Sequence, residues 1–276
     1  PPYLAAIAYF QRYHPTLRLI GSFETGFHQH IPPKAYLYSI PKKYAQEAGI
    51  RRYGYHGASH EYIATHLHQI ENTKNLKIIS CHLGGSGSLA AIVNGVSIDT
   101  SLGFSLQTGI FHNNRCGDID PFIPLYLQEE HHLTLQQVKT ILTKESGLFG
   151  LSGVSNDMRD IEAAAAKGNQ DALDCIETYA YAVRKQIGAY VAAMNGVDVV
   201  AFAGGIGENS PLIRSLVIQD LDCFGIQIDE EKNQMLKGQE GKISKATSPV
   251  RVYVVLTNEE IVVARKAYQY LLAHPH

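Results

Sequence analysis

LKIISCHLGGSGSLAAIVNGVSIDT, residues 76–100, is the stretch that decides the fold. Its apolar run from Leu76 to His82 predicts a buried strand, and the alternating runs Ser88–Val93 and Val96–Thr100 predict two more. Asn94-Gly95 between the last two runs predicts a two-residue hairpin turn, because both turn positions require a positive φ. We therefore expect a strand, a glycine-rich turn, a strand, a tight turn and a third strand.

The glycine-rich turn is the first candidate for ligand binding. Gly85 to Ala90 matches the loose G-x-G-x-x-[GA] dinucleotide pattern, but that pattern requires a following helix, and here a hairpin follows. Without Cβ atoms the backbone of residues 82–88 can approach an anion closely, and successive N–H groups can form an anion-binding nest. A plain glycine-rich hairpin is the alternative interpretation.

Helices and strands alternate along the rest of the chain, which favours an α/β architecture. Val197–Ala203 predicts a buried strand, Gly204–Asn209 a loop, and Ser210-Pro211 the N-cap and first residue of a helix. Ligands bind at the carboxyl ends of strands in open sheets, so this loop is a second candidate site, with a tight turn as its alternative. Thr257–Glu260 predicts a capping box before the last helix.

Other segments carry simpler patterns. We expect a strand at Leu17–Phe23, a helix over residues 34–48, and a helix from about Ser59 to Ile70 with Ser59 as its N-cap. Ser155 or Asn156 is expected to cap a further helix that ends near Lys167.

Composition excludes several classes of protein. The chain has 276 residues, of which 45% are hydrophobic and 18% charged, so it is long and apolar enough to form one large domain or two ordinary ones. A net charge of -2 and a pI near 6.7 do not match the basic surface of a nucleic-acid-binding protein. No apolar run approaches the roughly 20 residues of a membrane helix. Its four cysteines lack C-x-x-C spacing and are typical of reduced cytosolic thiols.

Two polar clusters could carry chemistry. Within Asn113–Pro121, Arg115 beside two carboxylates could bind a phosphate through its planar, charged fork, although a surface salt-bridge turn explains the same pattern. His56 and His60 have the four-residue spacing of zinc ligands on a helix. No HExxH motif accompanies them, and solvated or packed histidines are the simpler interpretation.

Several motifs together resemble the acetate kinase family of short-chain carboxylate kinases, in the family's order and over nearly the whole chain. They are RRYGYHGASH at 51–60, HLG at 82–84, DTSLGF at 99–104, RCGDIDP at 115–121, SGL at 146–148, DMRD at 157–160, GIGEN at 205–209 and TNEE at 257–260. The resemblance implies the acetate and sugar kinase, heat-shock chaperone and actin (ribonuclease H-like) fold. That fold has two similar α/β domains with a nucleotide cleft between them.

The resemblance also implies a domain organisation. The family carries an additional N-terminal segment with a phosphate-binding hairpin and a carboxylate-binding Arg, and this chain resembles the part that follows that segment. Residues 1–28 are expected to be a remnant of the N-terminal domain, and residues 29–261 the C-terminal nucleotide-binding domain. Residues 262–276 are expected to form a terminal helix that returns to the first domain.

The activity implied is Mg²⁺- or Mn²⁺-dependent, in-line transfer of the ATP γ-phosphoryl group to acetate, giving acetyl phosphate and ADP. Matching positions give Glu24, His56 and Arg115 as catalytic residues and Glu259 as the metal ligand. The nucleotide-binding residues implied are His82, Leu83, Gly84, Gly85, Ser86, Asp157, Met158, Arg159, Gly205, Ile206, Gly207, Glu208 and Asn209. A cytoplasmic homodimer that binds no nucleic acid and no membrane is also implied.

The chain departs from the family at several positions. Glu24 stands where the family has Asp, Gly85-Ser86 where it has Asn-Gly, and Asn113-Asn114 where it has Gly-Thr. Tyr55 and Leu106 replace a Phe and a Pro of the acyl pocket. These changes bear on the acid and the phosphoryl donor more than on the fold.

Three alternatives follow from these departures. The first is a propionate kinase or a pyrophosphate-dependent relative. The second is a catalytically incomplete chain that only binds nucleotide. The third is a chaperone-like or actin-like ATPase, which the motif at residues 51–60 disfavours.

Overall fold

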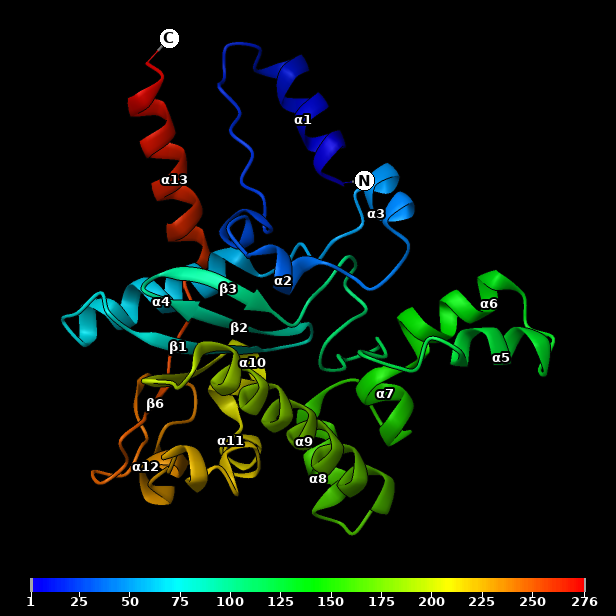
Figure 1. The fold of residues 1–276 in the computed structure, drawn as a ribbon, viewed down its shortest axis with the longest axis vertical. Coiled ribbons are helices and arrows are strands. Elements are labelled where there is room, and N and C mark those ends of the chain that lie inside the picture. The colour runs from blue at the N-terminus through cyan, green and yellow to red at the C-terminus, as the bar shows by residue number, and fades with distance from the viewer. Residues whose placement is uncertain (1, 276) are drawn as a thin grey trace.

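The stretch at residues 76–100 forms one half of a six-stranded mixed sheet at the centre of the molecule (Figure 1). The computed structural model describes residues 2–275. The strand order across the sheet is β3-β2-β1-β4-β6-β5. The strands are β1 (Lys77–Leu83), β2 (Gly87–Val93), β3 (Val96–Thr100), β4 (Val199–Ala203), β5 (Gly241–Lys242) and β6 (Arg251–Val254).

Helices account for most of the remaining regular structure. The α-helices are α1 (Pro2–Tyr13), α2 (Pro33–Tyr36), α3 (Lys42–Ala48), α4 (Gly57–Ile70), α5 (Ile123–Glu129), α6 (Leu135–Thr140), α7 (Gly147–Ser152), α8 (Met158–Ala165), α9 (Gln170–Met194), α10 (Gly204–Asn209), α11 (Pro211–Ile218), α12 (Glu230–Met235) and α13 (Glu259–Ala273). Short helical turns of other types are η1 (Gly26–His28), η2 (Ile141–Glu145) and η3 (Asp222–Phe224).

The directions of the strands bring the carboxyl ends of β1 and β4 to the same end of the sheet. β1 runs antiparallel to β2 and parallel to β4, and β4 runs parallel to β6. Asn94 and Gly95 join β2 to β3 with φ values of 52° and 83°, which confirms the predicted turn. Because β1 and β4 are parallel and His82 pairs with Ala203, their carboxyl ends meet at one edge of the sheet. The α/β class is confirmed.

Each face of the sheet is covered by helices. On one face, α4 packs Ile63, Ala64 and Leu67 against β1, β2 and β4. On the other face, the long helix α9 packs with α8, α11 and α7 over the alternate side chains of the same strands (Figure 1). Both cores are mainly apolar and closely packed, so the sheet is a rigid platform for its loops.

Three helical segments extend away from this platform. α5 and α6 form a projecting hairpin, and α1 and α13 both extend beyond the face that α4 covers (Figure 1). These segments expose large apolar side chains, with Phe122 at 71% and Leu272 at 64% exposure. In the part of the chain from 2 to 275, no helix combines the length and apolarity needed to span a membrane.

Two predicted elements near the N-terminus are wrong. Leu17–Phe23 forms no strand and pairs with none among residues 2–275; its large side chains Leu17, Leu19 and Phe23 are exposed, so it buries no face against the sheet. The helix expected over 34–48 is two helices, α2 and α3. Leu37 leaves the helical region with ψ of 140°, and Pro41 lacks the N–H that a continuous helix needs.

Helix starts also differ from the predictions. α4 begins at Gly57 with His56 in the left-handed conformation, and Ser59 lies inside the helix. Asp157, and not its two predecessors, caps α8, which ends at Ala165. The segment after β4 is the helix α10 rather than a loop. Asn258 alone caps α13, through its side chain and the N–H of Ile261, 3.1 Å apart.

Candidate functional site

The two glycine-rich segments meet where β1 and β4 end. Gly204 has φ of 74°, and a Cβ atom there would lie 2.8 Å from the carbonyl oxygen of Leu83. A Cβ atom on Gly84 would lie 3.8 Å from the backbone N of Gly205. Only glycine at 204 allows this approach, so the start of α10 sits directly against the turn that follows β1.

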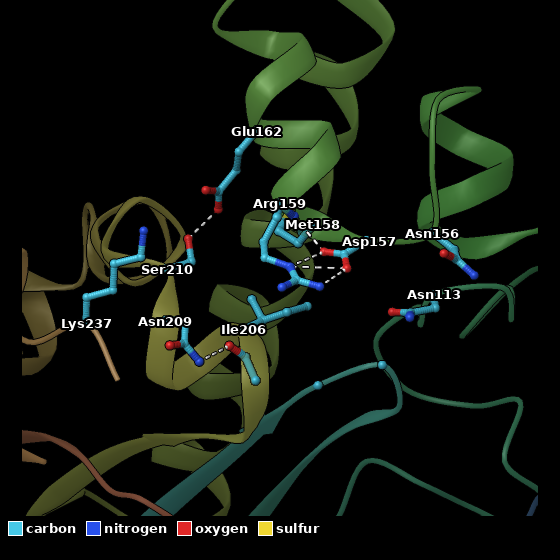
Figure 2. Close-up of a pocket in the computed structure, with 13 residues that line it drawn as sticks. Asn113, Asn156, Asp157, Met158, Arg159, Glu162, Ile206, Asn209, Ser210 and Lys237 are labelled. Atoms are coloured by element: carbon cyan, nitrogen blue, oxygen red, sulfur yellow. Dashed lines mark hydrogen bonds and ion pairs between the residues drawn. The ribbon is translucent and has the colours of Figure 1, made fainter. Parts of the chain in front are cut away.

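A cavity of about 550 Å³ opens beside this junction (Figure 2). Asn113 and Asn156 close one side of it, Asn209 and Lys237 lie toward the other, and Arg159 projects between them (Figure 2). Its complete lining is Gly84, Gly85, Asn113, Asn156, Asp157, Met158, Arg159, Glu162, Gly205, Ile206, Asn209, Ser210 and Lys237.

Most of the residues assigned to nucleotide binding line this cavity. They are Gly84, Gly85, Asp157, Met158, Arg159, Gly205, Ile206 and Asn209. The others support its walls. Leu83 is fully buried in the core, and Gly207 packs on Phe202 and Leu83. Glu208 accepts a hydrogen bond from the N–H of Gly204 at 3.0 Å. His82 lies in β1 and Ser86 in the turn that follows it, and neither lines the cavity.

Sequence reasoning missed five lining residues. They are Asn113, Asn156, Glu162, Ser210 and Lys237. For two of them the sequence carried a usable signal. Asn113 lies in the segment around Arg115. Ser210 was expected to cap a helix, and its Oγ does accept a hydrogen bond from the N–H of Ile213 at 3.1 Å. Lys237 carried none. It follows α12 and reaches the cavity because the N–H of Gly238 donates to the Glu208 carbonyl at 2.9 Å.

Arg159 and Asp157 form an ion pair on the cavity wall. The Asp157 carboxylate caps α8 by accepting from the Arg159 N–H at 2.9 Å, and the Arg159 Nε donates to it at 3.0 Å. These hydrogen bonds lower the pKa of Asp157 to about 2. Because the pair is exposed, it contributes little to the stability of the fold. Its effect is to hold the Arg159 guanidinium at the mouth of the cavity.

A second cluster lies behind the turn. His56 stacks on His82, with ring centroids 4.5 Å apart, and the charge of Arg115 acts on His56. Arg115 is half-buried, and its Nη1 donates a hydrogen bond to the Leu106 carbonyl at 3.1 Å, which anchors the guanidinium group. The structure therefore brings two predicted catalytic residues, His56 and Arg115, together at the side of the glycine turn.

A chain of hydrogen bonds sets the proton positions in this cluster. Ser80 Oγ lies 2.8 Å from His60 Nδ1, and Ser88 Oγ lies 2.8 Å from both His60 Nε2 and His56 Nδ1. Ser80 is fully buried, and within residues 2–275 its hydroxyl has no partner except His60, so it donates to His60. His60 then donates to Ser88, Ser88 donates to His56 Nδ1, and His56 holds its proton on Nε2.

Burial keeps these rings uncharged. Desolvation lowers the pKa of His56 to about 2, with further lowering from His82, His112 and Arg115. It lowers the pKa of His82 to about 4 and of His112 to about 3, and that of His60 well below its usual value. A neutral His56 with its proton on Nε2 is a hydrogen-bond donor, not a general base.

The charge of Glu24 acts on a second carboxylate, Glu259. The N–H of Gly57 donates to the Glu24 carbonyl at 3.0 Å, which places Glu24 next to His56. Glu259, the first residue of α13, is half-buried, and desolvation followed by the charge of Glu24 raises its pKa. Two like charges brought together in this way favour a bound cation. Between residues 2 and 275, no three His, Cys, Asp or Glu side chains gather into a metal-binding group.

Known proteins match both the sequence and the fold. The sequence profile of the Acetokinase family matches residues 1–265. The chain is 46% identical over 256 residues to an acetate kinase from Dichelobacter nodosus and 43% identical over 267 residues to one from Methanosarcina mazei. These matches cover 92% and 96% of this chain, which spans 65% of the length of each relative.

Solved structures agree. An acetate kinase from Porphyromonas gingivalis superposes with a TM-score of 0.93 at 38% identity, covering 97% of this chain and 68% of that one. A propionate kinase from Francisella tularensis gives 0.90 at 35% identity, covering 95% and 67%. The expected acetate and sugar kinase fold is thereby confirmed. By profile, identity and fold alike, the chain belongs to the acetokinase family.

Proposed function

We propose that the protein to which this chain belongs is an acetate kinase, a phosphotransferase with a carboxyl group as acceptor. It would reversibly transfer the ATP γ-phosphoryl group to acetate, giving acetyl phosphate and ADP. The observation that carries the proposal is the glycine-lined cavity where β1 and β4 end, with His56 stacked on His82 of β1, in a chain of this family. The chain spans about two thirds of its relatives, so activity is assigned to the intact protein.

The cavity would hold ATP with its phosphates toward the glycine turn. Backbone N–H groups of residues 84–86 can approach a phosphate because Gly84 and Gly85 carry no side chain. Arg159 and Lys237 add positive charge at the opening. Asp157, Met158 and the Gly205–Asn209 helix would then face the adenosine.

Arg115 and His56 would act on the transferred phosphoryl group. An acetate oxygen attacks the γ-phosphorus, the β–γ bridging P–O bond breaks, and its electron pair leaves on ADP. Negative charge on the three equatorial oxygens needs fixed donors in the transition state. The Arg115 fork supplies a charge, and the neutral His56 supplies one N–H from Nε2.

Glu259, with Glu24 beside it, would hold a magnesium or manganese ion. Half-burial and mutual repulsion raise the pKa of Glu259, and a divalent cation offsets both effects. When bound, the ion neutralises charge on the nucleotide phosphates. Two carboxylates suit Mg²⁺, which retains waters and phosphate oxygens as its other ligands.

Organisation and location complete the proposal. Residues 1–28 and 262–276 would belong to the N-terminal domain, and residues 29–261 would form the nucleotide-binding domain. A homodimer is supported by apolar side chains on the α5–α6 hairpin, including Phe122 and Leu135, which are 71% and 72% exposed. A cytoplasmic location is supported by four free cysteines.

The assay for acyl phosphate tests the function. The intact protein, given acetate and Mg-ATP, should form a species that hydroxylamine traps as acetohydroxamate, with ADP released in equal amount. Propionate in place of acetate, and pyrophosphate in place of ATP, distinguish the two related activities. Micromolar ATP binding without any acyl phosphate would leave only the nucleotide-binding alternative, and ATP hydrolysis without it would indicate an ATPase.

Glu259→Gln is expected to raise the Mg²⁺ concentration for half-maximal activity by more than about tenfold, because the amide keeps the shape but loses the charge. The neighbouring and exposed Glu260 provides the control, since Glu260→Gln should leave the Mg²⁺ dependence unchanged. Equal Mg²⁺ dependence in both variants would exclude Glu259 as the ligand.

A further inference from the structure

Gly85 and Asn113 face each other across the glycine turn. A Cβ atom on Gly85 would lie 3.0 Å from Nδ2 and 3.5 Å from Cγ of Asn113. The N–H of Asn113 also donates to the Gly85 carbonyl at 3.1 Å. The Asn113 carboxamide therefore occupies the space into which a side chain at position 85 would extend.

The backbone of Asn113 is anchored by hydrogen bonds, whereas its side chain faces the cavity. Its carbonyl accepts from the Phe149 N–H at 2.9 Å, which anchors it to α7. Its side chain makes no hydrogen bond to any other group in residues 2–275, although it lines the cavity (Figure 2). The neighbouring Asn114 differs, because its amide donates to the Lys144 carbonyl at 2.9 Å and its Oδ1 accepts from Asn156 at 3.0 Å.

These two positions are also the reciprocal departures noted in the sequence. By the resemblance described above, the family has Asn at the position of Gly85 and Gly at the position of Asn113. The contact at 3.0 Å gives the physical reason for the exchange, since two side chains could not share that space without displacement.

We infer that the Asn113 amide donates a hydrogen bond to the phosphate chain of the nucleotide, and that position 85 is glycine so that this amide fits. The inference rests on the proposed nucleotide site. It makes Gly85 and Asn113 one coupled pair, because a side chain at position 85 would displace the Asn113 amide from its place.

Nucleotide binding to four forms of the intact protein tests this pair by calorimetry. Asn113→Gly is expected to weaken ATP and ADP binding by roughly tenfold, because one hydrogen bond to a charged oxygen is lost. Gly85→Asn alone should also weaken it, since the new side chain meets Asn113. The double variant should return to within about threefold of the original affinity, which is the non-additivity expected of groups in contact.

Adenosine and a shape-matched variant supply the controls. Adenosine has no phosphate, so its affinity should be the same in all four proteins. Asn113→Asp keeps the shape but brings a negative charge to the phosphates, and should weaken ATP more than Asn113→Gly does.

The possible outcomes distinguish a failure of the Asn113 inference from a failure of the proposed nucleotide site. ATP affinity unchanged in Asn113→Gly and Asn113→Asp would overturn the role of Asn113 while leaving the nucleotide site in place. A double variant as weak as the two single variants combined would overturn the coupling. Failure of the original protein to bind ATP or ADP would overturn the proposed function and this inference together.

Discussion

Arg115→Ala in the intact enzyme is expected to lower kcat by about 10³-fold or more, while the Kd for ATP stays within about tenfold. Arg115 is half-buried and donates to the Leu106 carbonyl, its charge lowers the pKa of His56, and it is not among the residues that line the nucleotide cavity. In the proposed function its charge would act on the transferring phosphoryl group, where a lost arginine typically costs 10³- to 10⁵-fold in rate. Single-turnover kinetics and calorimetry measure the two quantities separately.

Arg159 provides the contrast for this experiment. It lines the cavity on an exposed ion pair with Asp157, so Arg159→Ala should raise the Kd for ATP and change kcat much less. Circular dichroism confirms that both variants are folded. Turnover by Arg115→Ala at the original rate would remove Arg115 from the chemistry.

Acidification from pH 7.5 to 5.5 is expected to destabilise the fold by several kcal/mol. Burial lowers the pKa of His28, His56, His60, His82 and His112 below the ordinary value of 6.5. The unfolded chain therefore binds more protons than the fold, so stability is complete above pH 6.5 and declines below it. At pH 5.5 each ring contributes a loss of about 1.4 kcal/mol, or roughly 7 kcal/mol together. That sum is comparable to the whole stability of a domain.

Urea denaturation at the two pH values measures this loss, and proton uptake at pH 5.5 identifies its source. About four to five protons beyond those of the exposed groups should bind on unfolding. His131 and His132 are exposed, so replacing both by Ala should leave the pH dependence as it was. A free energy of unfolding that is equal at pH 7.5 and 5.5 would show that these rings take up as many protons in the fold as in the unfolded chain, so that burial does not lower their pKa.

The conformational preferences of neighbouring residues were sufficient to predict several elements from the sequence. Asn94-Gly95 predicted the β2–β3 turn because only a few residues accept positive φ at both positions, and that preference needs no distant partner. Ser210-Pro211 predicted the start of α11 for the same kind of reason. The motifs around His56, Arg115 and residues 205–209 predicted the family, since their types and order are specific.

Pairing between distant segments could not be predicted in this way. Leu17–Phe23 has a strand composition, but a strand forms only where another strand offers free hydrogen bonds. Ser59 resembled a helix cap, yet its Oγ lies 2.7 Å from Nδ1 of His82, because a left-handed His56 starts α4 earlier.

What the sequence by itself determined was therefore the α/β class and the family, and it supplied the candidate residues for the chemistry. Only the tertiary structure decided how those residues act. The proton on His56 is set through His60 by Ser80 and Ser88, which lie 24 and 32 positions away along the chain. Asn113 is brought against Gly85 across 28 positions. Hydrogen bonds and excluded volume act between neighbours in space, and the fold alone makes these residues neighbours.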